Sequence, residues 1–200
     1  VSKAKECYPG DVTIEGADTV TDENKLNIKY KATTTEDTLL NLTNHAYFNL
    51  DGISGNTLDQ KLQINAEKFL ELDDEKIPTG NFIPMENHAF DFRSSKNVVA
   101  GIDHCFVLKN NTEPAAILES VKNGVTMKVY TDQPAVQIYV GGKTSDELQN
   151  KESVEYHTES GICFETQVFP DAPNHEDFPN AILRKGETYQ QNTTFQFIIS

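Results

Sequence analysis

The chain has 200 residues, and 31 acidic residues against 17 basic ones give a formal net charge of −14 at pH 7. Hydrophobic residues make up 37% of the sequence and aromatic residues 9%, which supplies a buried core and excludes disorder for most of the chain. A charge of this sign repels phosphate groups, and no apolar run reaches the about 20 residues of a membrane span. We therefore expect no nucleic acid and no membrane as partners.

Apolar and polar residues alternate with period two in several short stretches, which is the pattern of strands with one face on a core. In chain order these stretches are residues 11–14, 26–32, 62–66, 125–130, 136–140 and 194–199. Between the stretches lie turn residues, and Asn123-Gly124 predicts a hairpin with a type I′ turn. The best short helix candidates are residues 94–99 and 146–150. The pattern predicts an all-β fold, a mainly antiparallel β-sandwich that forms a single domain over residues 1–200.

The cysteines and histidines do not form a recognisable metal motif. Cys7, Cys105 and Cys163 are far apart and have no CxxC spacing, so we expect reduced thiols in a cytoplasmic protein. The five histidines form neither HxH nor HExxH, and the glycine-rich loops that bind nucleotides are absent from the sequence. We expect no metal and no cofactor.

Three strings place polar residues in apolar and aromatic surroundings: NLTNHAYFNL at 41–50, GIDHCFVL at 101–108 and GICFETQVFP at 161–170. A carboxylate in such surroundings is desolvated, which raises its pKa toward the range useful for proton transfer. Taken singly, each string also fits a structural role: a buried histidine, an aspartate that caps a turn, or a glutamate on the wet face of a strand. Together they supply a carboxylate, an imidazole and amides, a set that suits binding a polyhydroxylated ligand and moving its protons.

The string at 41–50 resembles the signature of the aldose 1-epimerases, also called galactose mutarotases. Further motifs similar to those of the family follow in its order: Glu6–Asp11, Ile77–Gly80, Ala89–Arg93, Glu165–Gln167 and Phe169–Asn174. The resemblance implies a large antiparallel β-sandwich of the galactose mutarotase-like type, which needs neither metal nor cofactor.

The resemblance also implies roles for particular residues. Glu165 corresponds to the general base and His45 to the general acid, and Asp103 corresponds to a residue that holds substrate hydroxyls. We expect the amides of Asn44 and Gln167 to bind the sugar as well.

The expected chemistry is the opening of a cyclic hemiacetal. A base removes the proton of the C1 hydroxyl while an acid protonates the ring oxygen, and we expect the two groups on opposite sides of the sugar ring. Tyr47, Phe48 and Phe169 are candidate apolar walls for the sugar, although each also fits a core position.

The sequence departs from the family pattern in three places. Val168 stands where a histidine is common, and Gly142 stands where an asparagine is common. We find no motif that matches the family's N-terminal portion, which carries another substrate-binding histidine and an arginine. We therefore expect residues 1–200 to be the C-terminal part of the domain, with that missing portion as a partner needed for full stability and activity.

Three functions remain open from the sequence. The leading hypothesis is an isomerase that interconverts the anomers of free aldohexoses such as galactose or glucose. Phosphorylated sugars are disfavoured, because Arg93 and Arg184 are the only arginines in an acidic chain. The alternatives are a glycosidase that uses Glu165 and Asp103 as paired carboxylates, and a non-catalytic carbohydrate-binding or regulatory sandwich.

Overall fold

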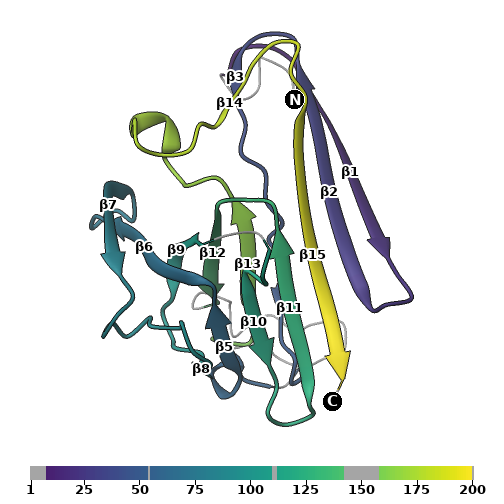
Figure 1. The fold of residues 1–200 in the computed structure, drawn as a ribbon, viewed down its shortest axis with the longest axis vertical. Helices are drawn as coiled ribbons and strands as arrows, with labels where there is room; N and C mark the ends of the chain where they lie inside the picture. Colours follow the sequence, from purple (N-terminus) through teal and green to yellow (C-terminus); the bar gives the residue numbers. More distant parts are fainter. Residues whose placement is uncertain (1–7, 54, 110–111, 142–157, 200) are drawn as a thin grey trace.

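The computed structural model describes residues 8–53, 55–109, 112–141 and 158–199; Cys7, Gly142 and the predicted helix at 146–150 lie outside these ranges. The described part is built from two larger antiparallel sheets and one short strand pair, as Figure 1 shows. Its helical content consists of two single turns of 3-10 helix, η1 (Thr57–Asp59) and η2 (Ala172–Asn174). Within those ranges we find no helix with the length and hydropathy that a bilayer span requires.

The seven-stranded sheet has the order β1-β2-β15-β11-β10-β5-β8. Its strands are β1 (Val12–Val20), β2 (Lys25–Thr34), β15 (Tyr189–Ile199), β11 (Val125–Thr131), β10 (Ala116–Glu119), β5 (Lys61–Ile64) and β8 (Lys96–Asn97). The long strands β1, β2 and β15 lie side by side at one edge (Figure 1).

The six-stranded sheet has the order β4-β13-β12-β9-β6-β7. Its strands are β4 (Tyr47–Phe48), β13 (Ile162–Gln167), β12 (Ala135–Val140), β9 (Asp103–Leu108), β6 (Ala66–Leu72) and β7 (Pro78–Pro84). A third pair joins β3 (Thr38–Leu39) to β14 (Ile182–Leu183).

One hydrophobic core lies between the two large sheets. Met127 and Phe195 of the seven-stranded sheet and Phe106 and Phe164 of the six-stranded sheet belong to the same buried cluster. Phe48 joins the two sheets, since its ring centroid lies 4.7 Å from that of Phe195 and 6.2 Å from that of Phe164. The predicted antiparallel β-sandwich is confirmed, and each of the six period-two stretches contributes to a strand.

The predicted hairpin at Asn123-Gly124 is confirmed, but its turn type is wrong. β10 and β11 pair antiparallel across residues 120–124, and Gly124 has a φ of 73° while Asn123 is not among the residues of positive φ. The Asn123 side chain instead accepts from the Val125 N–H at 3.0 Å and donates to the Leu50 carbonyl at 2.7 Å. A tertiary contact with a distant segment therefore decides the turn.

The helix predicted at residues 94–99 is also wrong. Lys96 and Asn97 form β8, which pairs with β5, and the N–H of the buried Val98 donates to the Gln60 carbonyl at 2.9 Å. The extended backbone is more stable here than a helix for two reasons. The β-branched Val98 favours an extended conformation and is buried in the core, and the peptide groups of this segment form hydrogen bonds with the edge of β5.

Candidate active site

Three adjacent strands bring the polar residues of two distant strings to one face of the six-stranded sheet. In the register, Gln137 of β12 lies opposite Glu165 of β13, and Tyr139 lies opposite Cys163 on one side and Asp103 of β9 on the other. Side chains two residues apart on a strand point to the same face. Asp103, Gln137, Tyr139, Cys163 and Glu165 therefore share the face opposite the hydrophobic core.

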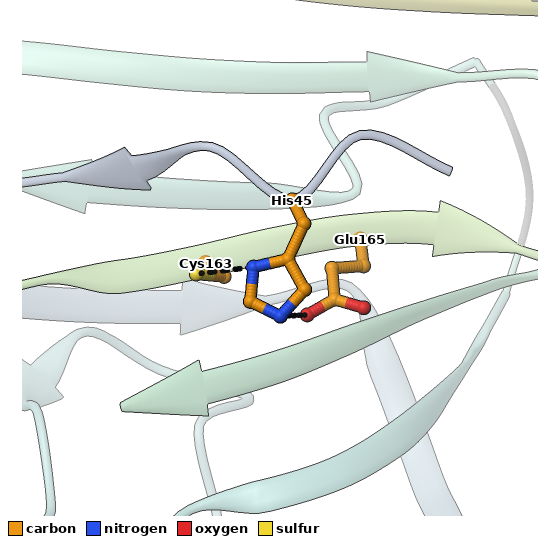
Figure 2. Close-up of side chains that lie close together, drawn as sticks. All are labelled: His45, Cys163 and Glu165. Carbon is orange, nitrogen blue, oxygen red and sulfur yellow. Dashed lines mark hydrogen bonds and ion pairs between the residues drawn. The ribbon is translucent and has the colours of Figure 1, made fainter. Parts of the chain in front are cut away.

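The short strand β4 adds the imidazole. Tyr47 pairs with Cys163, so continuing the antiparallel register by two residues places His45 opposite Glu165. His45 Nε2 lies 3.2 Å from Glu165 Oε1, and His45 Nδ1 lies 3.4 Å from Cys163 Sγ. Figure 2 shows the imidazole between the thiol and the carboxylate. The His45 side chain is 53% exposed and that of Glu165 is 13% exposed, so one wall carries an accessible imidazole above a largely buried carboxylate.

The environment of Glu165 sets its acidity. Burial raises the pKa of Glu165, the neighbouring His45 opposes this effect, and the carboxylate of Asp103 raises the pKa further. The pKa shift has the direction that the apolar setting of this string predicts. Asp103 is itself held in place, because Gln137 Nε2 donates to its Oδ1 at 2.7 Å.

A cavity of about 470 Å³ opens over this face. Its lining residues are His45, Tyr47, Leu72, Lys76, Pro78, Asp103, Cys105, Gln137, Tyr139, Glu165, Gln167 and Pro170. The rings of His45, Tyr47 and Tyr139 pack with centroid separations of 5.3 to 6.2 Å and form an aromatic wall. A cavity with one aromatic wall and several carboxylate and amide groups suits a small polyhydroxylated ligand.

Four of the five predicted site residues line this cavity: His45, Asp103, Glu165 and Gln167. The fifth, Asn44, lies outside the lining set, and its Oδ1 accepts a hydrogen bond from the Ala46 N–H at 3.0 Å. Asn44 therefore shapes the backbone beside His45, and its role as a sugar ligand stays a prediction.

The three candidate aromatic walls divide in the structure. Tyr47 is half exposed and lines the cavity, whereas Phe48 packs in the main core. Phe169 is buried in a second cluster, where its ring lies 5.1 Å from that of Phe178.

Sequence reasoning missed Lys76, Cys105, Gln137 and Tyr139 as cavity residues, and it missed Cys163 as the partner of His45 Nδ1. A signal for two of them was available, since Gln137 and Tyr139 alternate with apolar residues in a predicted strand and so share one face. The strands that pair with this one on either side are set by long-range contacts, and local alternation of apolar and polar residues does not predict them.

His45, Cys163 and Glu165 also bring three potential metal-ligand atoms within 4.8 Å of one another. A metal would require the thiolate of Cys163. Burial raises the pKa of this thiol, which favours its protonated form. His45 and Glu165 are in direct contact at 3.2 Å, which is the geometry that a proton-transfer pair needs.

The fold and the cavity together define an antiparallel β-sandwich protein with an imidazole–carboxylate pair in a polar cleft. The family model described as aldose 1-epimerase matches residues 1–196. The chain belongs to the aldose 1-epimerase family.

Individual relatives agree with this membership. The chain is 38% identical over 207 residues to a galactose mutarotase of Mus musculus and 34% identical over 208 residues to an aldose 1-epimerase of Escherichia coli (strain K12). These alignments cover 98% and 96% of the chain and 60% of each relative, so the chain spans about 60% of the length of these curated relatives.

Solved structures show the same fold. A crystal structure of a GalM/aldose epimerase homologue from C. elegans superposes with a TM-score of 0.89 at 31% identity, covering 100% of this chain and 64% of that one. A galactose 1-epimerase from Lactobacillus acidophilus NCFM gives a TM-score of 0.85 at 27% identity, covering 99% of this chain and 60% of that one.

Proposed function

We propose that the chain carries the acid–base centre of an aldose 1-epimerase, an isomerase that interconverts the α and β anomers of free hexoses such as galactose or glucose. Glu165 acts as the general base and His45 as the general acid. The observation that carries the proposal is the 3.2 Å contact between His45 Nε2 and Glu165 Oε1 in a cavity of sugar size.

The relative position of acid and base fits hemiacetal opening. We expected the two groups on opposite sides of the sugar ring, but the structure has them next to each other on one wall. The C1 hydroxyl and the ring oxygen are bonded to the same carbon, so neighbouring groups reach both oxygens from one side. The adjacent arrangement can therefore serve the ring-opening step, and the side of the ring that each group faces stays a prediction.

The proton transfers follow from this arrangement. Glu165 takes the proton of the C1 hydroxyl, the bond between C1 and the ring oxygen breaks, and His45 protonates that oxygen. The aldehyde group then rotates about the bond to C2. The reverse transfers close the ring on its other face, so no net proton is gained or lost.

The charges of the cavity favour a neutral substrate. Two carboxylates, Asp103 and Glu165, line it, and its described lining residues include one lysine, Lys76, and no arginine. A phosphorylated sugar would bring further negative charge toward these carboxylates, which costs free energy in a partly desolvated site. Asp103, fixed by Gln137, is placed to accept hydrogen bonds from neutral sugar hydroxyls.

We further propose that another portion of the family domain packs against this chain. β1 carries exposed apolar residues, with Ile14 40% and Val20 79% exposed. A second cavity of about 630 Å³, with more apolar than polar lining, lies between residues 8–10, 38–42 and 169–174. An exposed edge strand and an open apolar cavity are the features expected where a sandwich continues.

We also place the protein in the cytoplasm. The buried thiols of Cys105 and Cys163 are free, as is usual in reducing compartments.

Polarimetry tests the proposed activity. Mutarotation of α-galactose is followed with the chain alone and with the chain fused behind the N-terminal part of the murine relative. We expect catalysis above the spontaneous rate in the fusion, and its loss when His45 and Glu165 are replaced together. Absence of catalysis in both proteins while each remains folded would overturn the proposal, and release of nitrophenol from nitrophenyl galactosides would favour a glycosidase.

A further inference from the structure

The imidazole of His45 has two polar contacts in the described part of the chain, and only one of them is explained by the proposed acid–base step. Glu165 lies at Nε2, whereas Cys163 lies at Nδ1 with its Sγ at 3.4 Å. We propose that Cys163 is a positioning residue, whose thiol hydrogen-bonds Nδ1 and thereby presents Nε2 as the nitrogen that exchanges protons with the sugar. The catalytic part of this inference rests on the proposed function, while the geometric part stands by itself.

Packing alone does not hold the imidazole. The side chain of His45 is 53% exposed, and its aromatic neighbours Tyr47 and Tyr139 lie at centroid distances of 5.3 and 6.0 Å with tilted and edge-on rings. Such contacts leave two ring orientations, related by a flip, with similar packing. The hydrogen bonds at Nδ1 and Nε2 distinguish the two orientations, because the bond that one nitrogen makes sets the protonation of the other.

A thiol suits both protonation states that a general acid passes through. As a general acid, His45 starts as an imidazolium, and its Nδ1–H donates a hydrogen bond to the sulfur of Cys163, which lies 3.4 Å away. After Nε2 has protonated the sugar, the neutral imidazole keeps its proton on Nδ1, and the sulfur accepts a hydrogen bond from this N–H. The thiol neither gains nor loses a proton in this cycle, and no bond to sulfur forms.

The surroundings keep Cys163 neutral. Its side chain is fully buried, and burial, together with the charge of Glu165, raises the pKa of the thiol. A second carboxylate at Nδ1 would hold the imidazolium and make His45 a weaker acid. A neutral thiol orients the imidazole without adding a charge.

The direct test observes the imidazole rather than the reaction. Nitrogen-15 NMR of histidine-labelled protein reports which ring nitrogen of His45 is protonated and hydrogen-bonded. We expect one dominant tautomer in the wild type and in Cys163→Ser, because a hydroxyl also donates and accepts. In Cys163→Ala we expect a mixture of tautomers. Cys105→Ala, which removes another buried thiol from β9, is the matched control and leaves the His45 signals as in the wild type.

The kinetic test separates positioning from packing. In the protein used for polarimetry, Cys163→Ala lowers kcat by about three- to tenfold, the worth of one neutral hydrogen bond, while KM changes little. Cys163→Ser restores most of the lost kcat. Because the imidazole loses a partner, the pH dependence of kcat also shifts in the alanine variant and returns toward the wild type in the serine variant.

Each outcome decides the inference. Unchanged His45 nitrogen signals in Cys163→Ala overturn it, whatever happens to the rate. Changed signals with an unaltered kcat overturn its catalytic part. If the wild type shows no mutarotation, the proposed function fails, and the nitrogen signals still decide whether Cys163 sets the tautomer.

Discussion

Replacing Glu165 by glutamine removes the base and preserves the shape of the site. Glutamine has nearly the volume of glutamate, and its side-chain oxygen still accepts a hydrogen bond from His45 Nε2, which lies 3.2 Å from the carboxylate. A general base contributes about 10² to 10⁴ in rate, which is about 2.7 to 5.4 kcal/mol of activation free energy. One lost ground-state hydrogen bond is worth only about 0.5 to 1.5 kcal/mol. We therefore expect the change to appear in kcat rather than in KM.

The same substitution has a distinct signature in stability. Since burial raises the pKa of Glu165 in the folded protein, the folded state binds this proton more tightly than the unfolded state does. The wild type is therefore favoured below the ordinary glutamate pKa and loses stability as the pH rises through the raised value. Relative to the wild type, Glu165→Gln becomes more stable as the pH rises across this window, while its kcat is low throughout.

Glu67 provides a matched control on the same sheet. It is on β6 and pairs with Lys109 and Arg93, and the hydrogen bond from Lys109 is the main cause that lowers the pKa of its carboxyl. Relative to the wild type, Glu67→Gln should be less stable above the ordinary glutamate pKa, with a difference that shrinks as the pH falls through the lowered value, and it should keep its mutarotation rate. Polarimetry and urea unfolding between about pH 4 and pH 8 measure both effects. Mutarotation by Glu165→Gln near the wild-type rate, well above the spontaneous reaction, would show that another group is the base.

Three further substitutions test the cavity and its surroundings. Asp103→Asn should raise KM for galactose by about tenfold or more with little change in kcat, since a charge-assisted contact to substrate hydroxyls is lost equally in the ground and transition states. Polarimetry over a range of sugar concentrations separates the two constants. Gly161→Ala would place a Cβ 2.8 Å from Cδ1 of Tyr47, so the displaced ring should raise KM by about two- to tenfold. Asp91→Asn should lower stability at about pH 6, because Arg93 lowers the pKa of Asp91 to about 2. The stability difference from the wild type should disappear as the pH falls from about 4 to about 2, as measured by urea unfolding.

Each of these expectations has its own contradicting result. A fall in kcat of the Asp103 variant equal to that of Glu165→Gln would place Asp103 in the chemical step. Gly16→Ala is the control for the glycine change, because its Cβ would meet the nearest atom at an ordinary 3.6 Å. An equal rise in KM for both glycine variants would refute the role of Tyr47. A stability loss in Asp91→Asn that persists at pH 2 would show that packing, and not the ion pair with Arg93, is responsible.

The sequence by itself determined the strands and the identity of the chemical groups. Alternation along 125–130 and 136–140 is a local property that places one set of side chains on the core, and the structure buries Met127 and Ile138 accordingly. The apolar residues Ile162 and Phe164 come just before Glu165 in the sequence. The raised pKa of Glu165 could therefore be predicted from the sequence alone.

The tertiary structure decided what depends on residues distant in the chain. Lys96 and Asn97, in the predicted helix 94–99, formed a strand because β5 offered a free edge, and Asn123 in the hairpin turn does not have the positive φ of a type I′ turn while its side chain donates to the Leu50 carbonyl. The register of β4 on β13 placed His45 beside Glu165 and Cys163, 120 and 118 residues away along the chain. The alternation along a strand specifies which face of the sheet a side chain occupies. Its neighbours on that face, however, are specified by strand pairing, which depends on the residues of both paired strands.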